Sequence, residues 1–198
     1  MNASIEKYLK TYNVLQIGGW LAGLLCLPFN FLIGYYIIAL FQVYSLMEVF
    51  YAYKKWYNSS PVYSFLQIGA RLFILFFSYV LILSSVFSPL PWLNEIVHIM
   101  LMAWCLAEII RYAYYAMLLF KRDYRWLTTL RYTAFILLYP LGAACECYIL
   151  FLIFQLNAIL WIKILIIGVA ILYVFMFPKL YLHLLHQRKQ KLAEFVKN

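Results

Sequence analysis

The sequence predicts an all-α membrane protein: a bundle of six membrane-spanning helices with both chain termini on the cytoplasmic side. Hydrophobic residues make up 67% of the 198 residues and charged residues only 12%, about half the share found in soluble domains. The mean hydropathy is +0.85. Apolar runs recur along the chain, each near the length of about 20 residues that crosses a bilayer. The runs are continuous rather than alternating, which favours helices over β-strands.

One domain over residues 1–198 is expected, because neither a soluble domain nor an internal repeat interrupts the apolar runs. Pro28 and Asn30 separate the first two runs, and turn-forming residues at 58–61 and 88–91 precede the third and fourth. The fifth run is long enough to need a bend or a tilt. The spans are predicted at residues 14–29, 31–53, 62–87, 92–120, 126–156 and 158–178, followed by a basic tail at 179–198.

The formal net charge of +9 marks membrane topology rather than a nucleic-acid partner, because the basic residues are spread over short connections. Lys and Arg occur near the N-terminus, at Lys54-Lys55, at 121–125 and from Lys179 onward, and they are missing from the intervening connections. The positive-inside rule therefore places both termini and the two basic connections in the cytoplasm. Lys163 is the one exception, and its long side chain can reach the interface from a helix end.

The fifth run carries a carboxylic acid and a phenol in one helical register. A carboxylate inside hydrocarbon costs roughly 2–3 kcal/mol or more, so Glu146 is a functional candidate. Tyr139 precedes it by seven residues, a spacing that returns to within about 20° of the same helix face at an axial offset of about 10 Å. Pro140 weakens the helix between them, and a bend there could open a cavity. Both side chains are therefore predicted to face one cavity as proton-transfer groups.

Further charges fall in the half of the spans that is predicted to be cytoplasmic. We expect these charges to pair with one another, because a lone charge at this depth is costly. One interpretation is a structural ion pair between Glu108 and Arg111, which share a helix face. The other is a net positive mouth that binds an anionic ligand. The charged residues are Glu48, Arg71, Glu108, Arg111 and Arg131, and the candidate substrate-binding residues are Arg71, Arg111, Arg131, Tyr112 and Tyr115.

The segment from Cys105 to Arg111 has the Cys-to-Arg spacing of a tyrosine phosphatase loop. That chemistry requires a glycine-bearing loop whose amides hold phosphate, with a thiolate at a helix start. Here the segment is an apolar helix without glycine, so phosphatase activity is not expected. No His or Cys spacing indicates a metal site, and the four cysteines are expected to be structural thiols.

Several motifs together resemble the very-long-chain 3-hydroxyacyl-CoA dehydratase family, once described as protein tyrosine phosphatase-like. The resemblance covers nearly the whole chain and departs from expectation at Cys145 and Cys147, which flank Glu146. The motifs are Tyr12-Asn13 with Gly19-Trp20, Phe41-Gln42 with Glu48, Gln67 with Arg71, Trp104-x-x-x-Glu108-Ile-Ile-Arg111-Tyr112-x-x-Tyr115, Leu130-Arg131-Tyr132-x-x-Phe135-x-x-Leu138-Tyr139-Pro140-x-Gly142-x-x-x-Glu146, and Pro178-x-x-Tyr181-x-His183-x-x-x-Gln187-Arg188.

The resemblance implies a six-span enzyme of the endoplasmic reticulum membrane that converts very-long-chain 3-hydroxyacyl-CoA to trans-2-enoyl-CoA, the third step of fatty acid elongation. It implies that Tyr139 and Glu146 are the catalytic pair, with no cofactor beyond the coenzyme A of the substrate. The implied partners are membrane lipid and the other elongation enzymes, namely the condensing enzyme, the ketoacyl reductase and the enoyl reductase. Two alternatives are a catalytically silent membrane scaffold of the same fold and a transporter or proton relay. Repeated broken helices would favour the transporter, and the sequence shows none.

Overall fold

A computed structural model describes residues 3–57, 59–85, 90, 92–122, 124–156 and 159–197. Within these ranges the regular elements are all helices, so the all-α prediction is confirmed. In chain order the helices are α1 (Ala3–Cys26), α2 (Phe31–Tyr44), α3 (Met47–Tyr53), α4 (Pro61–Ser85), α5 (Leu93–Leu119), α6 (Arg125–Leu156) and α7 (Leu160–Lys197).

Local chemistry determines the turn between α1 and α2. Helix α1 ends just before Pro28, which lacks the amide that would continue the helix. Asn30 caps α2, since its side-chain oxygen accepts the amide of Ile33 at 3.0 Å. Gly34 allows α2 to pass close to this turn, because a Cβ there would lie 2.8 Å from the backbone nitrogen of Leu27.

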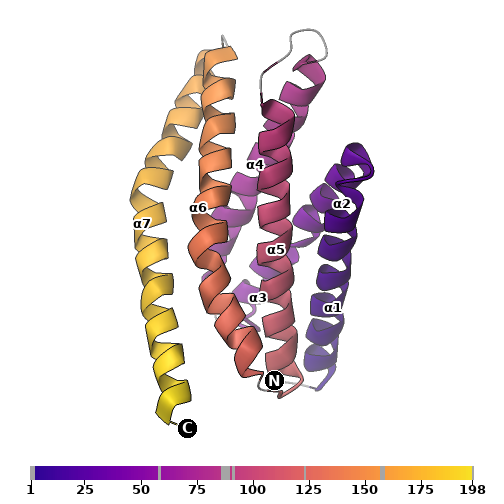
Figure 1. Cartoon of the computed structure of the whole chain (residues 1–198), viewed down its shortest axis with the longest axis vertical. Coiled ribbons are helices and arrows are strands. Elements are labelled where there is room, and N and C mark those ends of the chain that lie inside the picture. The colour runs from indigo at the N-terminus through magenta and orange to yellow at the C-terminus, as the bar shows by residue number, and fades with distance from the viewer. Residues whose placement is uncertain are drawn as a thin grey trace.

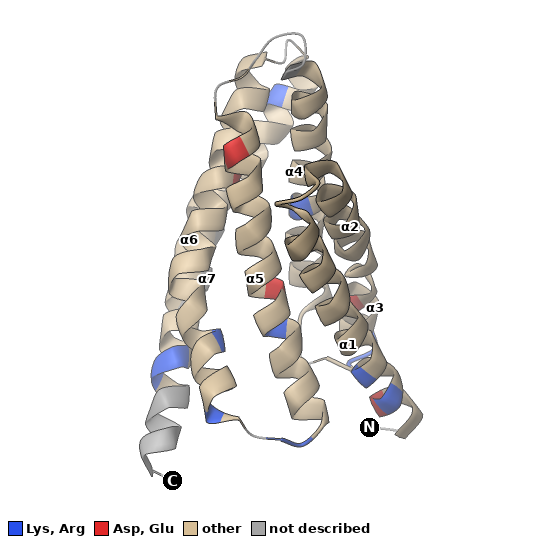
Figure 2. Cartoon of the chain, turned by 45° about the vertical axis from the view of Figure 1, so that its right-hand side comes forward, with Lys and Arg blue, Asp and Glu red and all other residues tan. Residues whose placement is uncertain are grey.

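The helices run side by side as a bundle, with α5 packed between α1 and α6 and with α7 on the outside of α6 (Figure 1). Both chain ends lie at one end of the bundle, together with the last turn of α5 and the first turn of α6. The last turn of α6 and the first turn of α7 lie at the opposite end. Most Lys and Arg residues gather toward the end that holds the termini (Figure 2).

Five stretches of the described chain are long and apolar enough to cross a membrane: residues 31–53, 61–84, 93–119, 125–156 and 160–190. Helix α1, whose first turns carry Glu6, Lys7 and Lys10, is not among them. The described structure thus confirms a helical chain with several membrane-length apolar segments.

Large apolar side chains cover the outside of the bundle, and several polar side chains are buried in its interior among the apolar core residues. Large apolar residues are widely exposed, as at Phe76, Leu137 and Trp161, which are 63%, 71% and 78% exposed. The interior contains Asn13 and Gln16, both fully buried. So extensive an apolar outer surface is unusual for a soluble protein and suits a hydrocarbon surrounding.

Three helices differ in extent from the predicted spans. Helix α1 begins at Ala3 and ends at Cys26, so it starts well before residue 14, the predicted start of the first span. A turn at Ser45 and Leu46 divides the second apolar run into α2 and α3. The Ser45 hydroxyl donates to the carbonyl oxygen of Gln42 at 2.6 Å and so supports that turn. Helix α7 continues through Pro178 to Lys197, so most of the predicted basic tail is helical. The predicted boundaries at residues 87 and 158, and the end of the predicted tail at residue 198, lie outside the described residues.

Candidate active site

Glu146 lies on the inner face of α6 and is only 7% exposed. One carboxylate oxygen, Oε1, accepts the indole N–H of Trp104 on α5 at 2.8 Å. The other, Oε2, accepts the hydroxyl of Tyr173 on α7. Three helices thus hold one buried acid, and both of its oxygens face a donor.

Tyr139 lies half-buried on α6, two turns before Glu146, with its ring against α7. The ring stacks on Phe177 at a centroid distance of 4.8 Å and on Tyr181 at 6.3 Å, each with an interplanar angle of 12°. Among the described residues, no group forms a hydrogen bond with the Tyr139 hydroxyl. This hydroxyl is therefore free to bind a ligand.

The structure shows no direct contact between Tyr139 and Glu146, so their shared cavity remains a prediction. Helix α6 contains Pro140 at its midpoint and changes direction partway along its length (Figure 1). A proline removes one helix hydrogen bond and crowds the preceding turn, which is the usual cause of such a bend.

Arg71 on α4 connects the buried acid to a charged cluster. Its guanidinium carbon lies 4.9 Å from the centre of the Trp104 ring, the same indole that donates to Glu146. The same guanidinium donates to Glu108. Trp104 is thereby held between a cation and a carboxylate, which fixes the direction of its N–H.

Two carboxylates and two guanidiniums form a buried cluster across α3, α4 and α5. Arg111 donates to both oxygens of Glu48, each at 2.9 Å, and its Nε donates to Glu108 at 2.7 Å. Glu48 and Glu108 are 4% and 3% exposed. The prediction that these charges pair is confirmed for Glu48, Glu108, Arg71 and Arg111. With two charges of each sign, the cluster is neutral.

A small polar cavity of about 20 Å³ adjoins the cluster, with room for about one water molecule. Its walls include Gln42, whose buried Oε1 has no hydrogen-bond partner among the described residues. A water molecule would satisfy that oxygen.

Arg131 departs from the prediction, because no carboxylate of the described chain pairs with it. Its guanidinium instead lies 4.2 Å from the ring centre of Tyr114, 4.8 Å from that of Tyr115 and 5.6 Å from that of Tyr132. Aromatic faces attract a guanidinium electrostatically, and this replaces the expected ion pair. Of the three arginines predicted to form a positive mouth, only Arg131 keeps an uncompensated charge.

The two predicted tyrosines have different surroundings. Tyr112 is fully buried and its hydroxyl donates to Glu48, so it belongs to the neutral cluster. Tyr115 is half-buried, with its ring 5.6 Å from that of Tyr57 and beside Arg131. Tyr115 therefore remains a candidate for ligand contact.

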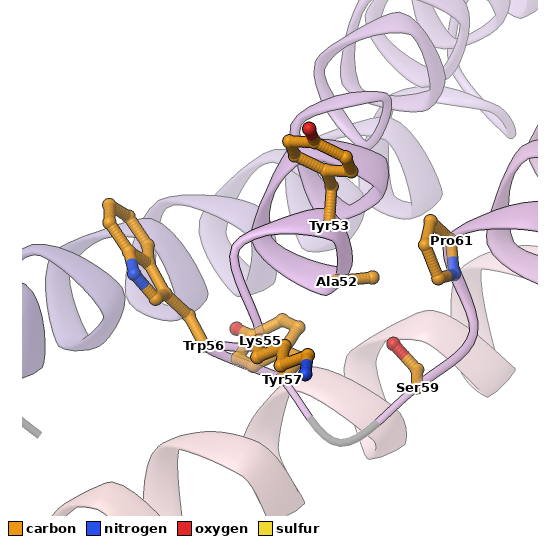
Figure 3. A pocket seen from close by; sticks show the side chains of 7 residues that line it. All are labelled: Ala52, Tyr53, Lys55, Trp56, Tyr57, Ser59 and Pro61. Carbon is orange, nitrogen blue, oxygen red and sulfur yellow. The ribbon is translucent and has the colours of Figure 1, made fainter.

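An open pocket of about 540 Å³ lies where α3 leads into α4 (Figure 3). Tyr57, which lines it, connects it to Tyr115 through their ring contact. None of the predicted catalytic or substrate-binding residues lines this pocket, which comprises Ala52, Tyr53, Lys55, Trp56, Tyr57, Ser59 and Pro61.

The arrangement suits proton transfer. Glu146 can take or give a proton, and the Tyr139 hydroxyl can donate one, which are the two roles of general acid–base catalysis. Among the described residues, no group of three or more His, Cys, Asp or Glu side chains is placed to hold a metal ion.

Trp104 and Tyr173, which bind the carboxylate of Glu146, were not among the predicted site residues. The available signal was the spacing of Tyr173, Phe177 and Tyr181, which recur every four residues and form one aromatic stripe on α7. That stripe faces α6, as the ring contacts of Tyr139 show.

We expect Trp104→Phe to lower kcat by about tenfold to a hundredfold while KM changes little, because one hydrogen bond to a charged group is worth about 1.5–3 kcal/mol. In this variant Glu146 would keep its place in α6 but would lose the indole N–H that orients its carboxylate. Trp20→Phe is the matched control, since Trp20 is equally buried and donates its N–H to Gln16 at 3.1 Å on α1. Steady-state kinetics would compare both variants with the wild type, and Trp20→Phe should keep the wild-type kcat. If kcat of Trp104→Phe equals that of Trp20→Phe, Trp104 does not position Glu146.

Comparison with known proteins gives one family and several relatives. The sequence model of the family described as “Protein tyrosine phosphatase-like protein, PTPLA” matches residues 42–194. A Schizosaccharomyces pombe protein named “Probable very-long-chain (3R)-3-hydroxyacyl-CoA dehydratase” is 31% identical, over 93% of this chain and 92% of its own length. A Caenorhabditis elegans very-long-chain (3R)-3-hydroxyacyl-CoA dehydratase, hpo-8, is 30% identical over 96% of both chains. The human very-long-chain (3R)-3-hydroxyacyl-CoA dehydratase 2 is 29% identical over 94% of this chain and 81% of its own. No solved structure gives a significant match.

Proposed function

Because the chain belongs to the protein tyrosine phosphatase-like (PTPLA) family, we propose that it dehydrates very-long-chain 3-hydroxyacyl-CoA to trans-2-enoyl-CoA. This reaction is the third step of fatty acid elongation. The observation that carries the proposal is the buried carboxylate of Glu146, held by Trp104 and Tyr173, on the same helix as the free hydroxyl of Tyr139.

Two proton transfers carry out the dehydration, and a third restores the two side chains. Glu146 takes the proton from the carbon next to the thioester, the new double bond forms, and the bond from C3 to its hydroxyl oxygen breaks. Tyr139 gives a proton to the departing hydroxyl, which leaves as water. The proton on Glu146 then returns to the phenolate, so neither group is consumed. The reverse assignment uses the same two groups and has the same balance. Side chains account for every proton, and so we propose no cofactor beyond the coenzyme A of the substrate.

The membrane arrangement that we propose has six spans, with α1 as the first. Helix α1 has 24 residues, about 36 Å at 1.5 Å per residue and long enough to cross a bilayer. Its polar residues Asn13 and Gln16 are buried inside the bundle rather than turned toward lipid. Both termini lie at the end where Lys and Arg gather (Figure 2), and the positive-inside rule makes this end cytoplasmic.

We further propose that the membrane is that of the endoplasmic reticulum. The resemblance is the basis for this location and for the elongation partners: the condensing enzyme, the ketoacyl reductase and the enoyl reductase. The acyl chain would lie among the apolar helices, while the nucleotide part of coenzyme A stays at the basic end.

The deciding experiment uses purified protein in neutral-lipid nanodiscs with a 3-hydroxyacyl-CoA of long chain. Loss of water to the trans-2-enoyl product is followed by mass spectrometry. Turnover is the expected result. A well-folded protein that binds the thioester and produces no enoyl product would overturn the proposed activity and favour the silent scaffold.

Glycosylation in cells tests the orientation. Asn2-Ala3-Ser4 and Asn58-Ser59-Ser60 are both acceptor sequences, and Asn2 and Asn58 lie outside the described residues. We expect neither to carry glycan, because both are placed in the cytoplasm. An acceptor sequence inserted with a flexible spacer between Asn157 and Ala158 should be modified, which provides the positive control. Glycan on Asn58 would show that the proposed orientation is wrong and that the chain has the opposite one.

A further inference from the structure

Two guanidiniums in the half of the α6–α7 pair nearest the chain termini each keep a buried nitrogen without a hydrogen-bond partner among the described residues. These atoms are Nη1 of Arg131 on α6 and Nε of Arg188 on α7. Buried donors are almost always paired, because an unpaired one loses its bonds to water without replacement. Two such donors on neighbouring helices indicate a missing acceptor.

The helix register brings the two arginines to the same region. Tyr181 of α7 packs against Phe135 of α6 at a ring distance of 5.8 Å, and its hydroxyl lies 3.5 Å from the carbonyl oxygen of Ile136. Arg188 follows Tyr181 by seven residues, which is about 10 Å along α7. The two helices run in opposite directions, so Arg188 lies level with about residue 129, within one turn of Arg131.

The surroundings select an anion as the missing acceptor. The guanidinium of Arg131 is bordered by the rings of Tyr114, Tyr115 and Tyr132, and no described carboxylate pairs with it. Arg71 and Arg111, in contrast, are already bound to Glu108 and Glu48. Guanidinium forks match phosphate oxygens in geometry and charge.

We propose that Arg131 and Arg188 form a binding site for the phosphate groups of coenzyme A. This inference rests on the proposed function and names the subsite that holds the nucleotide end of the substrate. Arg71 and Arg111 are not part of this site, because they belong to the neutral cluster with Glu48 and Glu108.

The spacing along α6 agrees with the length of the substrate. Arg131 precedes Tyr139 by eight residues, an axial distance of about 12 Å. The pantetheine arm between the thioester sulfur and the first phosphate has about a dozen bonds, equal to about four extended peptide units and so about 14 Å. A phosphate at Arg131 therefore places the thioester near Tyr139.

The test compares two thioesters of one 3-hydroxyacyl group, one with coenzyme A and one with pantetheine, which lacks every phosphate. Arg131→Gln and Arg188→Gln are each expected to raise KM for the coenzyme A thioester by about tenfold, the loss of one charge-assisted hydrogen bond. KM for the pantetheine thioester should stay within about twofold of the wild-type value, because no phosphate contact is lost. Lys163→Gln, which removes a cation near the start of α7 at the opposite end of the bundle, should change neither KM.

Arg131→Lys provides a second variant that keeps the charge, and it should recover part of the affinity. Equal KM values for wild type and both Gln variants with the coenzyme A thioester would overturn the site. If the two arginines instead bind a lipid phosphate, KM for the coenzyme A thioester should be unchanged in the Gln variants, and less anionic phospholipid should copurify with them. That result would also overturn the assignment to coenzyme A.

Calorimetry with coenzyme A alone separates this inference from the proposed activity. If coenzyme A binds to the wild type and binds about tenfold more weakly to Arg131→Gln, the site is supported. If, in addition, neither thioester is dehydrated, only the proposed activity is overturned. Dehydration of both thioesters with unchanged KM in the variants would overturn the site alone.

Discussion

Tyr139→Phe and Glu146→Gln should each lower kcat by about 10²-fold or more, the usual contribution of a positioned acid or base. The first change removes a hydroxyl that has no partner among the described residues, so the stack on Phe177 and Tyr181 should survive. The second keeps the shape of the side chain and an oxygen that can accept the Trp104 N–H. Steady-state kinetics on folded protein would measure both losses.

The double variant distinguishes one shared step from two separate steps. If both groups act on one reaction coordinate, the fold reduction in kcat of the double variant should be far smaller than the product of the two single reductions. Tyr181→Phe is the matched control, because its ring lies in the same stack and its hydroxyl makes only a 3.5 Å contact with a backbone carbonyl. Its kcat should stay near the wild-type value.

Tyr173 is the alternative source of the phenol, since its hydroxyl contacts Glu146 directly. We expect Tyr173→Phe to reduce kcat less than Tyr139→Phe does, because the Tyr173 hydroxyl is already bound to the base. A larger loss in Tyr173→Phe would transfer the acid role to Tyr173. Normal turnover in Tyr139→Phe would remove Tyr139 from the mechanism.

The fold class and the placement of the buried acid could be predicted because both depend on local and energetic rules. Apolar run length and the Pro28–Asn30 break are local signals, and the helices follow them closely. That Glu48 would need a cationic partner followed from the cost of burying a charge. Its particular partner, Arg111, is 63 residues away, and only the tertiary arrangement of α3 and α5 brings the two side chains together.

The surroundings of the candidate site were harder to predict. Arg131 was expected to pair with a carboxylate, and three tyrosine rings from α5 and α6 take that place. Tyr173 lies in an apolar run with several aromatic residues, and no sequence feature distinguishes it from the others. Only the position of α7 against α6 brings its hydroxyl to Glu146. Such contacts between distant helices depend on tertiary packing, which single-sequence periodicity does not report.

Arg111→Met should destabilise the protein by about 3–5 kcal/mol, the cost of leaving a buried charge without its partner. Among the described residues, Arg111 is the one cation bound to Glu48, and it shares Glu108 with Arg71. Of the described side chains, the hydroxyls of Tyr12 and Tyr112 would then be the donors left to Glu48. A large drop in the thermal unfolding midpoint in detergent is the expected measurement.

A second substitution identifies the source of that loss. In Glu48→Gln with Arg111→Met, the unpaired carboxylate is gone, so the double variant should be less destabilised than the sum of the two single changes. Lys10→Met is the surface control. Its ammonium lies 2.7 Å from Glu6, before the predicted spans, and lowers the pKa of that partly exposed carboxyl through their hydrogen bond. Because solvent screens this pair, the unfolding midpoint should barely change. An Arg111→Met protein that is as stable as the Lys10→Met protein would show that the buried cluster does not hold α3 to α5.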